Sequence, residues 1–229
     1  MPILLPENIR LPARIPPQPD LRGSFRRRGN PTCKSRDSDQ TPQMPQYIAF
    51  LRGINVGGHR VKMDRLKELF EELGFDDVWT FIASGNVIFR TKSGKPEALA
   101  KKIETQLSQA LGYDVPTVLK TPTELSQITA TKPFADCSCA DDDLYVVLLG
   151  QTAPKESSAR LNALATQDDE FMVQDREIFW LRRKPVSESR ISTSALTKAI
   201  GVTHTMRNMT MMRKLESRTT NNTPDRDLL

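Results

Sequence analysis

The stretch YIAFLRGINVGG (residues 47–58) decides how the first half of this sequence folds. Its first part, residues 47–54, is almost entirely apolar, which is typical of a buried strand. After Arg52 the stretch contains three glycines and an asparagine, which indicates a tight turn. Residues 62–74, KMDRLKELFEELG, then predict an amphipathic helix that ends at a glycine. One face of this helix carries Leu66, Leu69, Phe70 and Leu73.

The next segments complete a recognisable order of elements. WTFIA (79–83) and VIFRT (87–91) are β-rich and separated by three residues, which predicts a hairpin. Residues 96–112 predict a helix that opens with proline and ends at glycine. The strand VPTVLK (115–120) contains a proline and is expected at a sheet edge. The order β-α-β-β-α-β is the split pattern of ferredoxin-like folds. Residues 121–124, TPTE, start a further helix with a capping box.

The pattern recurs in the second half without detectable identity. LYVVLLG (144–150) predicts a buried strand, and a helix is predicted after Pro154. Residues 170–174 and 177–183 flank a turn and predict a second hairpin. Residues 189–201 predict a helix that ends at a glycine. The sequence therefore predicts two structural repeats of the β-α-β-β-α type.

The predicted fold class is α+β, with two ferredoxin-like β-α-β-β-α repeats, antiparallel sheets and a C-terminal helix capped by Asn208. Residues 1–43 are rich in proline and arginine without helical or strand periodicity, which predicts a disordered extension. Met44 begins MPQYIAFLRG, which favours a start of translation at that residue. The predicted parts are 1–43 (disordered extension), 44–135 (first subdomain with a linker helix), 136–218 (second subdomain) and 219–229 (disordered tail).

Charge and composition narrow the classes of function. The net charge is +5, but residues 1–45 carry eight Lys/Arg against four Asp/Glu, so the folded part is nearly neutral. This disfavours a broad nucleic-acid-binding face. No apolar stretch approaches the roughly 20 residues that span a membrane. Three cysteines form no disulfide framework, which favours the cytoplasm.

No metal, cofactor or catalytic triad is expected. Cys137 and Cys139 are too close for a zinc pair and lack a second ligand pair. His59 and His204 have no acid or nucleophile at a diagnostic spacing. Gly53 and Gly58 have the spacing of a phosphate-binding loop, but histidine and arginine follow where lysine and serine or threonine are needed.

Two phrases in this sequence resemble the bacterial domain-of-unknown-function family 1697. They are Tyr47 to Gly58 and FIASGNVIF (81–89). Weaker matches are Pro133-Phe134, Ser189-Arg190-Ile191, and Thr205 with Arg207 and Asn208; Met209 stands where the family has tryptophan. The resemblance covers about residues 44–218 and implies a soluble bacterial protein of this fold, without a known activity.

The topology predicts a polar corner. In a β-α-β-β-α-β sheet the strand order is 4-1-3-2, so the end of strand one lies beside the turn that precedes strand three. An arginine fork and open backbone N–H groups suit a carboxylate or a phosphate. The residues brought together are Arg52, Gly53, Asn55, Ser84, Gly85 and Asn86.

A purely structural reading of the same residues stays open. The glycines supply positive φ, and the asparagines bond their own turns. Arg207 and Asn208 either join the corner or cap the last helix. Three functions therefore compete: binding of a small anionic or polar ligand, RNA binding by an exposed sheet face, and an enzyme at this corner. The enzyme would need Arg52, His59 or His204 as its active group.

Overall fold

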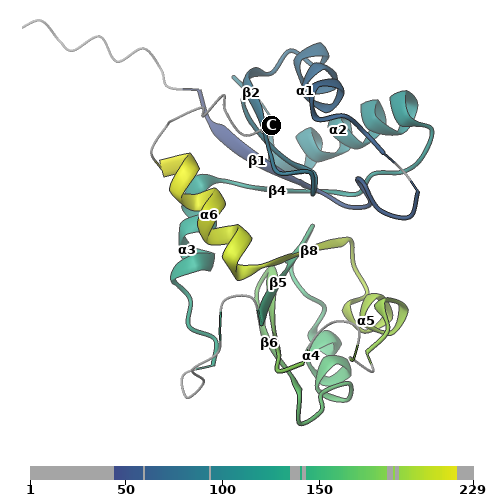
Figure 1. Cartoon of the computed structure of the whole chain (residues 1–229), viewed down its shortest axis with the longest axis vertical. Coiled ribbons are helices and arrows are strands. Elements are labelled where there is room, and N and C mark those ends of the chain that lie inside the picture. The colour runs from purple at the N-terminus through teal and green to yellow at the C-terminus, as the bar shows by residue number, and fades with distance from the viewer. Residues whose placement is uncertain are drawn as a thin grey trace, which may run out of the picture. The chain divides into compact units, whose positions relative to one another are not determined.

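The computed structural model describes residues 44–58, 60–92, 94–134, 140, 143–184, 188 and 191–220 (Figure 1). All of them belong to one compact unit, Pro42–Leu229. The predicted extension 1–43 and most of the predicted tail lie outside the described residues, as does the predicted boundary at 135–136.

The first sheet consists of four antiparallel strands in the order β2-β3-β1-β4. The edge position of β4 agrees with the proline before it. Two helices, α1 and α2, bury their leucine-rich faces on one side of this sheet, and α2 ends at the left-handed Gly112. The elements are β1 (Gln46–Leu51), α1 (Met63–Glu72), β2 (Asp76–Phe81), β3 (Asn86–Arg90), α2 (Pro96–Leu111) and β4 (Thr117–Lys120).

The second sheet is also antiparallel, in the order β6-β7-β5-β8. Its helices α4 and α5 cover one face around Leu161 and Leu196. The helices α3 and α6, one from each half of the chain, lie side by side (Figure 1). The elements are α3 (Pro122–Ala130), β5 (Leu144–Leu149), α4 (Lys155–Asn162), β6 (Asp169–Gln174), β7 (Glu177–Arg182), α5 (Thr193–Ile200), β8 (His204–Asn208) and α6 (Met209–Thr220).

The two four-stranded antiparallel sheets confirm the predicted α+β class. One element was missed, because β8 adds a fourth strand to a half that was predicted as β-α-β-β-α. The segment HTMRN (204–208) is polar at every position except Met206, so its sequence does not show the alternation of apolar and polar residues that predicts a strand. Its pairing with β5 from Tyr145↔Asn208 to Leu149↔His204 makes it a strand. The last helix also runs to Thr220, two residues beyond the predicted boundary at 218.

The two halves share a core. The faces of both sheets that are not covered by α1, α2, α4 and α5 contribute to one buried layer with α3 and α6. Ile48, Phe50 and Ile88 of the first sheet and Val146 and Leu148 of the second are all fully buried in it. The halves therefore stabilise one another by burial of apolar area.

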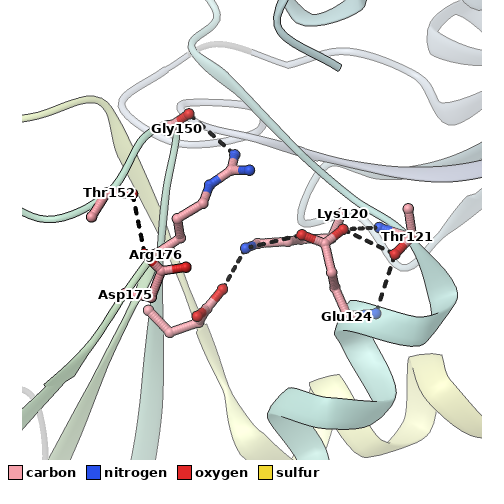
Figure 2. Close-up of polar contacts among 8 residues, drawn as sticks. Lys120, Thr121, Glu124, Gly150, Thr152, Asp175 and Arg176 are labelled. Atoms are coloured by element: carbon pink, nitrogen blue, oxygen red, sulfur yellow. Dashed lines mark hydrogen bonds and ion pairs between the residues drawn. The ribbon is translucent and has the colours of Figure 1, made fainter. Parts of the chain in front are cut away.

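A charged contact crosses this apolar layer (Figure 2). Lys120, at the end of β4, is only 1% exposed, and its Nζ pairs with Glu177 of β7 and lies 3.7 Å from Oε1 of Glu124 on α3. The capping box holds Glu124 in place, because its carboxylate accepts from the N–H and the hydroxyl of Thr121 at 2.7 and 2.9 Å. A buried ammonium group is tolerated here because two carboxylates compensate its charge.

We expect Lys120→Met to lower the free energy of unfolding by about 3 kcal/mol, since the Glu177 carboxylate then lacks its counter-charge. The double variant Lys120→Met/Glu177→Gln should recover part of this loss, because neither charge remains. Urea denaturation measures both. Lys67→Met is the control, because its pair with Glu71 is half exposed and should contribute less than about 1 kcal/mol. Additive effects of the two substitutions would contradict the predicted coupling.

Candidate functional site

The predicted corner forms where the loop after β1 meets the turn between β2 and β3. Asn55 joins them: its Nδ2 donates to the Ala83 carbonyl at 2.9 Å, and its Oδ1 accepts from the Val61 N–H at 2.8 Å. Asn55 has φ 57°, which asparagine tolerates better than most residues. Arg52, Gly53 and Asn55 therefore lie on one wall of the corner, and Ser84, Gly85 and Asn86 lie on the other.

Gly85 permits the close approach of these two walls. Its carbonyl accepts from the Leu51 N–H at 2.8 Å, and its φ is +74°. A Cβ at this position would lie 3.0 Å from Cβ of Ile54 and 3.2 Å from Cβ of Leu51. Both the positive φ and the contact distance therefore require glycine.

Gly85→Ala should destabilise the protein more than Gly112→Ala. Both glycines have nearly the same φ, +74° and +79°, so the backbone strain of about 1–2 kcal/mol is common to both. No heavy atom lies within 4 Å of a Cβ at Gly112, so only Gly85→Ala adds crowding, of about 1–3 kcal/mol. Chemical denaturation compares the two variants, and equal losses would show that the close approach costs nothing.

The Arg207 side chain, from β8, occupies the corner. Its Nη2 donates to the carbonyls of Leu51 and Ser84 at 2.9 and 2.8 Å. Its Nε donates to Oδ1 of Asn86 at 2.8 Å, and its Nη1 donates to the Thr205 hydroxyl at 2.8 Å. Burial lowers the pKa of Arg207 to about 10, so the guanidinium is still charged at neutral pH. Within the described part of the chain, no carboxylate pairs with it.

Asn86 and Asn208 are also used inside the protein. Asn86 is fully buried, and its Nδ2 donates to the Phe81 carbonyl and the Ser84 hydroxyl at 3.0 and 2.9 Å. Asn208 caps α6, because its Oδ1 accepts from the Met211 N–H at 3.0 Å. Of the two C-terminal candidates, Arg207 thus joins the corner and Asn208 caps the helix.

Arg207→Lys should lower the free energy of unfolding by about 3 kcal/mol, because a lysine cannot serve carbonyls on both sides of the corner with a planar fork. Arg65→Lys on the exposed face of α1 is the matched control and should stay within about 0.5 kcal/mol of the unmodified protein. Thermal or urea unfolding measures the difference. If both substitutions had the same small effect, the Arg207 hydrogen bonds would contribute little.

Arg52 differs from Arg207 in how it is bound. Its backbone N–H donates to the Pro116 carbonyl at 2.9 Å, which fixes the end of β1 against the residue before β4. Its guanidinium makes one hydrogen bond, from Nη2 to the Thr197 hydroxyl of α5 at 3.4 Å. No carboxylate pairs with it within the described ranges, and beside it a Cβ on Gly53 would meet only open space. Most of its donor capacity is therefore available.

Thr197 connects Arg52 to His204, the first residue of β8. The Thr197 hydroxyl lies 3.5 Å from Nε2 of His204, and Nδ1 of His204 lies 2.9 Å from the Val202 carbonyl. A carbonyl only accepts, so Nδ1 carries the hydrogen and Nε2 faces Thr197 with its lone pair. Burial lowers the pKa of His204, and the charge of Arg52 lowers it further. Sequence reasoning missed Thr197 because nothing local distinguishes it from other helical threonines.

Several sequence predictions concern residues outside the described ranges. These are Cys137 and Cys139, His59, and the pair Ser189-Arg190. Among the residues that the structure does describe, no group of three His, Cys, Asp or Glu side chains could hold a metal ion. Within the same residues, no helix combines the length and apolar character that crossing a bilayer requires.

The fold and this corner define a two-sheet α+β protein with two arginines at the junction of its halves, neither of which has an acidic partner among the described residues. The chain belongs to the family described as "Protein of unknown function (DUF1697)", whose model matches residues 44–179. Both N-terminal phrases lie inside the matched range, whereas Arg207 lies beyond it.

The fold is similar to that of the conserved bacterial protein SP0830 from Streptococcus pneumoniae. The two chains share 23% identity with a TM-score of 0.63, and the similarity covers 77% of this chain and 99% of that one. At this identity the likeness concerns the fold alone. No curated protein matches the chain.

Proposed function

We propose that this protein binds a small anion at Arg52. One observation carries the proposal: the Arg52 guanidinium has a single long hydrogen bond of 3.4 Å and no carboxylate partner among the described residues. A guanidinium held at a strand end with free donors is well suited to the planar oxygen pairs of carboxylates, phosphates and sulfates.

The electrostatic surroundings favour an anion over a neutral ligand. Arg207 places a second charged guanidinium in the same corner, again without a carboxylate in the described part of the chain. His204, the neighbouring imidazole, carries no negative charge in either protonation state. The potential at Arg52 is therefore positive, and a bound anion would be attracted by both arginines.

The predicted site residues divide by role in this proposal. Arg52 and Gly53 line the proposed ligand position, because Arg52 makes one long hydrogen bond and a Cβ on Gly53 would meet only open space. The other six have structural roles rather than contacting the ligand, since their polar groups are hydrogen-bonded within the protein: five in the corner, and Asn208 at the start of α6. These six are Asn55, Ser84, Gly85, Asn86, Arg207 and Asn208.

The RNA-binding alternative loses its main support. Base stacking on a ferredoxin-like sheet needs exposed aromatic side chains on its central strands. Phe50 on β1 and Ile88 on β3 point into the layer shared by both halves and are 0% exposed. We infer that each half is a ferredoxin-like unit with a final helix α6 added, and that the face which would stack bases serves as the joint between the units.

For the location of the protein we also propose the cytoplasm, because three cysteines form no disulfide framework.

Isothermal titration with sulfate should detect binding to the unmodified protein and to Arg65→Ala, but not to Arg52→Ala. Arg65 is a suitable control, because it is an exposed arginine whose removal changes the net charge equally. The same series in a thermal melt separates the site from the general stabilising effect of sulfate, which acts on all three proteins alike. Sulfate binding of equal strength by Arg52→Ala would refute the proposed site.

A further inference from the structure

We propose that the anion site takes up a proton together with its anion, and that Thr197 and His204 are the residues that couple the two events. This inference rests on the proposed binding of an anion at Arg52. It adds Thr197, which the sequence did not assign, and it gives His204 a role in ligand binding. It also predicts that the affinity for the anion increases as the pH falls.

The geometry provides a continuous polar chain from the ligand position to the imidazole. Arg52 Nη2 lies 3.4 Å from the Thr197 hydroxyl, and that hydroxyl lies 3.5 Å from His204 Nε2. The far end is fixed, because Nδ1 of His204 donates to the Val202 carbonyl at 2.9 Å. His204 is only 4% exposed, and this chain links its Nε2 to the Arg52 guanidinium.

With His204 neutral, the chain opposes an anion. Nε2 is then an acceptor, so the Thr197 hydroxyl hydrogen points toward the imidazole. The oxygen of Thr197 accepts from Arg52 and presents its lone pairs to the ligand position. An anion at Arg52 would meet these lone pairs and would gain no donor from Thr197.

With His204 protonated, the direction of the chain reverses. Nε2 becomes a donor to the Thr197 oxygen, so the Thr197 hydroxyl hydrogen is free to rotate toward the anion. The anion then gains a hydrogen bond from Thr197 and the attraction of a second nearby cation. In turn the anion offsets the charge of Arg52, which otherwise holds the pKa of His204 down. By reciprocity, the proton strengthens anion binding by the factor by which the anion strengthens proton binding.

The other elements around His204 bring no competing carboxylate among the described residues. From the loop after β1 the charged neighbour is Arg52, and from α5 the polar neighbour is Thr197. On β5 the paired residue is the apolar Leu149. From α4, Arg160 approaches the end of α5, with Nη1 3.6 Å from a Cβ placed on Gly201. The charged groups near the His204 imidazole are thus cations. A bound anion would offset their charge and so favour protonation of His204.

The test uses sulfate, because it stays a dianion between about pH 5.5 and about pH 8, where an imidazole titrates. The sulfate affinity of the unmodified protein should rise as the pH falls, with a slope approaching about tenfold per pH unit for one proton bound. His204→Asn keeps a donor for the Val202 carbonyl and removes Nε2, so its affinity should be independent of pH. Thr197→Val should weaken the pH dependence, because the hydrogen bond from Thr197 is lost and only the attraction of the charged imidazole remains, and Thr197→Ser should keep it in full.

The outcomes separate this inference from the proposed function. If sulfate binds through Arg52 with the same affinity at every pH, or if Thr197→Val keeps the full pH dependence, the coupling through Thr197 and His204 is refuted and the anion site stands. If sulfate binds at no pH, both the anion site and the coupling are refuted. A pH-dependent affinity that is weakened in Thr197→Val and kept in Thr197→Ser supports both.

A second measurement does not depend on the strength of sulfate binding. The chain has two histidines, so His59→Gln assigns the remaining imidazole signal in a nuclear magnetic resonance titration to His204. Arg52→Ala should raise the pKa of His204, because it removes the cation that opposes protonation. An unchanged His204 pKa in Arg52→Ala would show that the two side chains are not coupled and would overturn the inference.

Discussion

The Arg207 guanidinium is the interaction on which the arrangement of this protein depends. It leaves β8 in the second half of the chain and donates to the carbonyls of Leu51 and Ser84 in the first. The Leu51 carbonyl is at the last residue of β1, and the Ser84 carbonyl is in the turn before β3. Because unpaired carbonyls are costly and Arg207 supplies several donors in one plane, a single side chain closes the corner and joins both halves.

The two arginines differ in the number of hydrogen bonds that they make within the protein. We infer a structural role for Arg207 and a binding role for Arg52 from this difference. Arg207 donates hydrogen bonds to carbonyls, to Asn86 and to Thr205. Arg52 gives one long hydrogen bond to Thr197. Since a guanidinium binds an external anion only with donors that the protein has not already used, we assign the proposed ligand position to Arg52. The glycines and asparagines between them serve the geometry of the corner.

The shared layer between the two sheets has a second consequence. It removes the central strands from solvent, so the surface that such a sheet usually offers to a partner is used to join the halves. The polar groups of the layer are confined to its margins, with Lys120 and Glu177 at one place and Arg207 with Asn86 at another. The proposed anion site lies outside this layer, in the loop after β1 that holds Arg52 and Gly53.

The sequence by itself determined the local elements, because their signals are local. Apolar runs defined β1 and β5, the capping box at Thr121 started α3, and the positive φ of Gly112 ended α2. The alternation of helices and hairpins also placed the end of β1 beside the turn before β3. The sequence could not predict β8, since its strand character comes from pairing with β5. Nor could it separate the roles of Arg52 and Arg207 or assign Thr197, because these depend on which distant atoms each side chain reaches, and that is decided only when the two halves pack together.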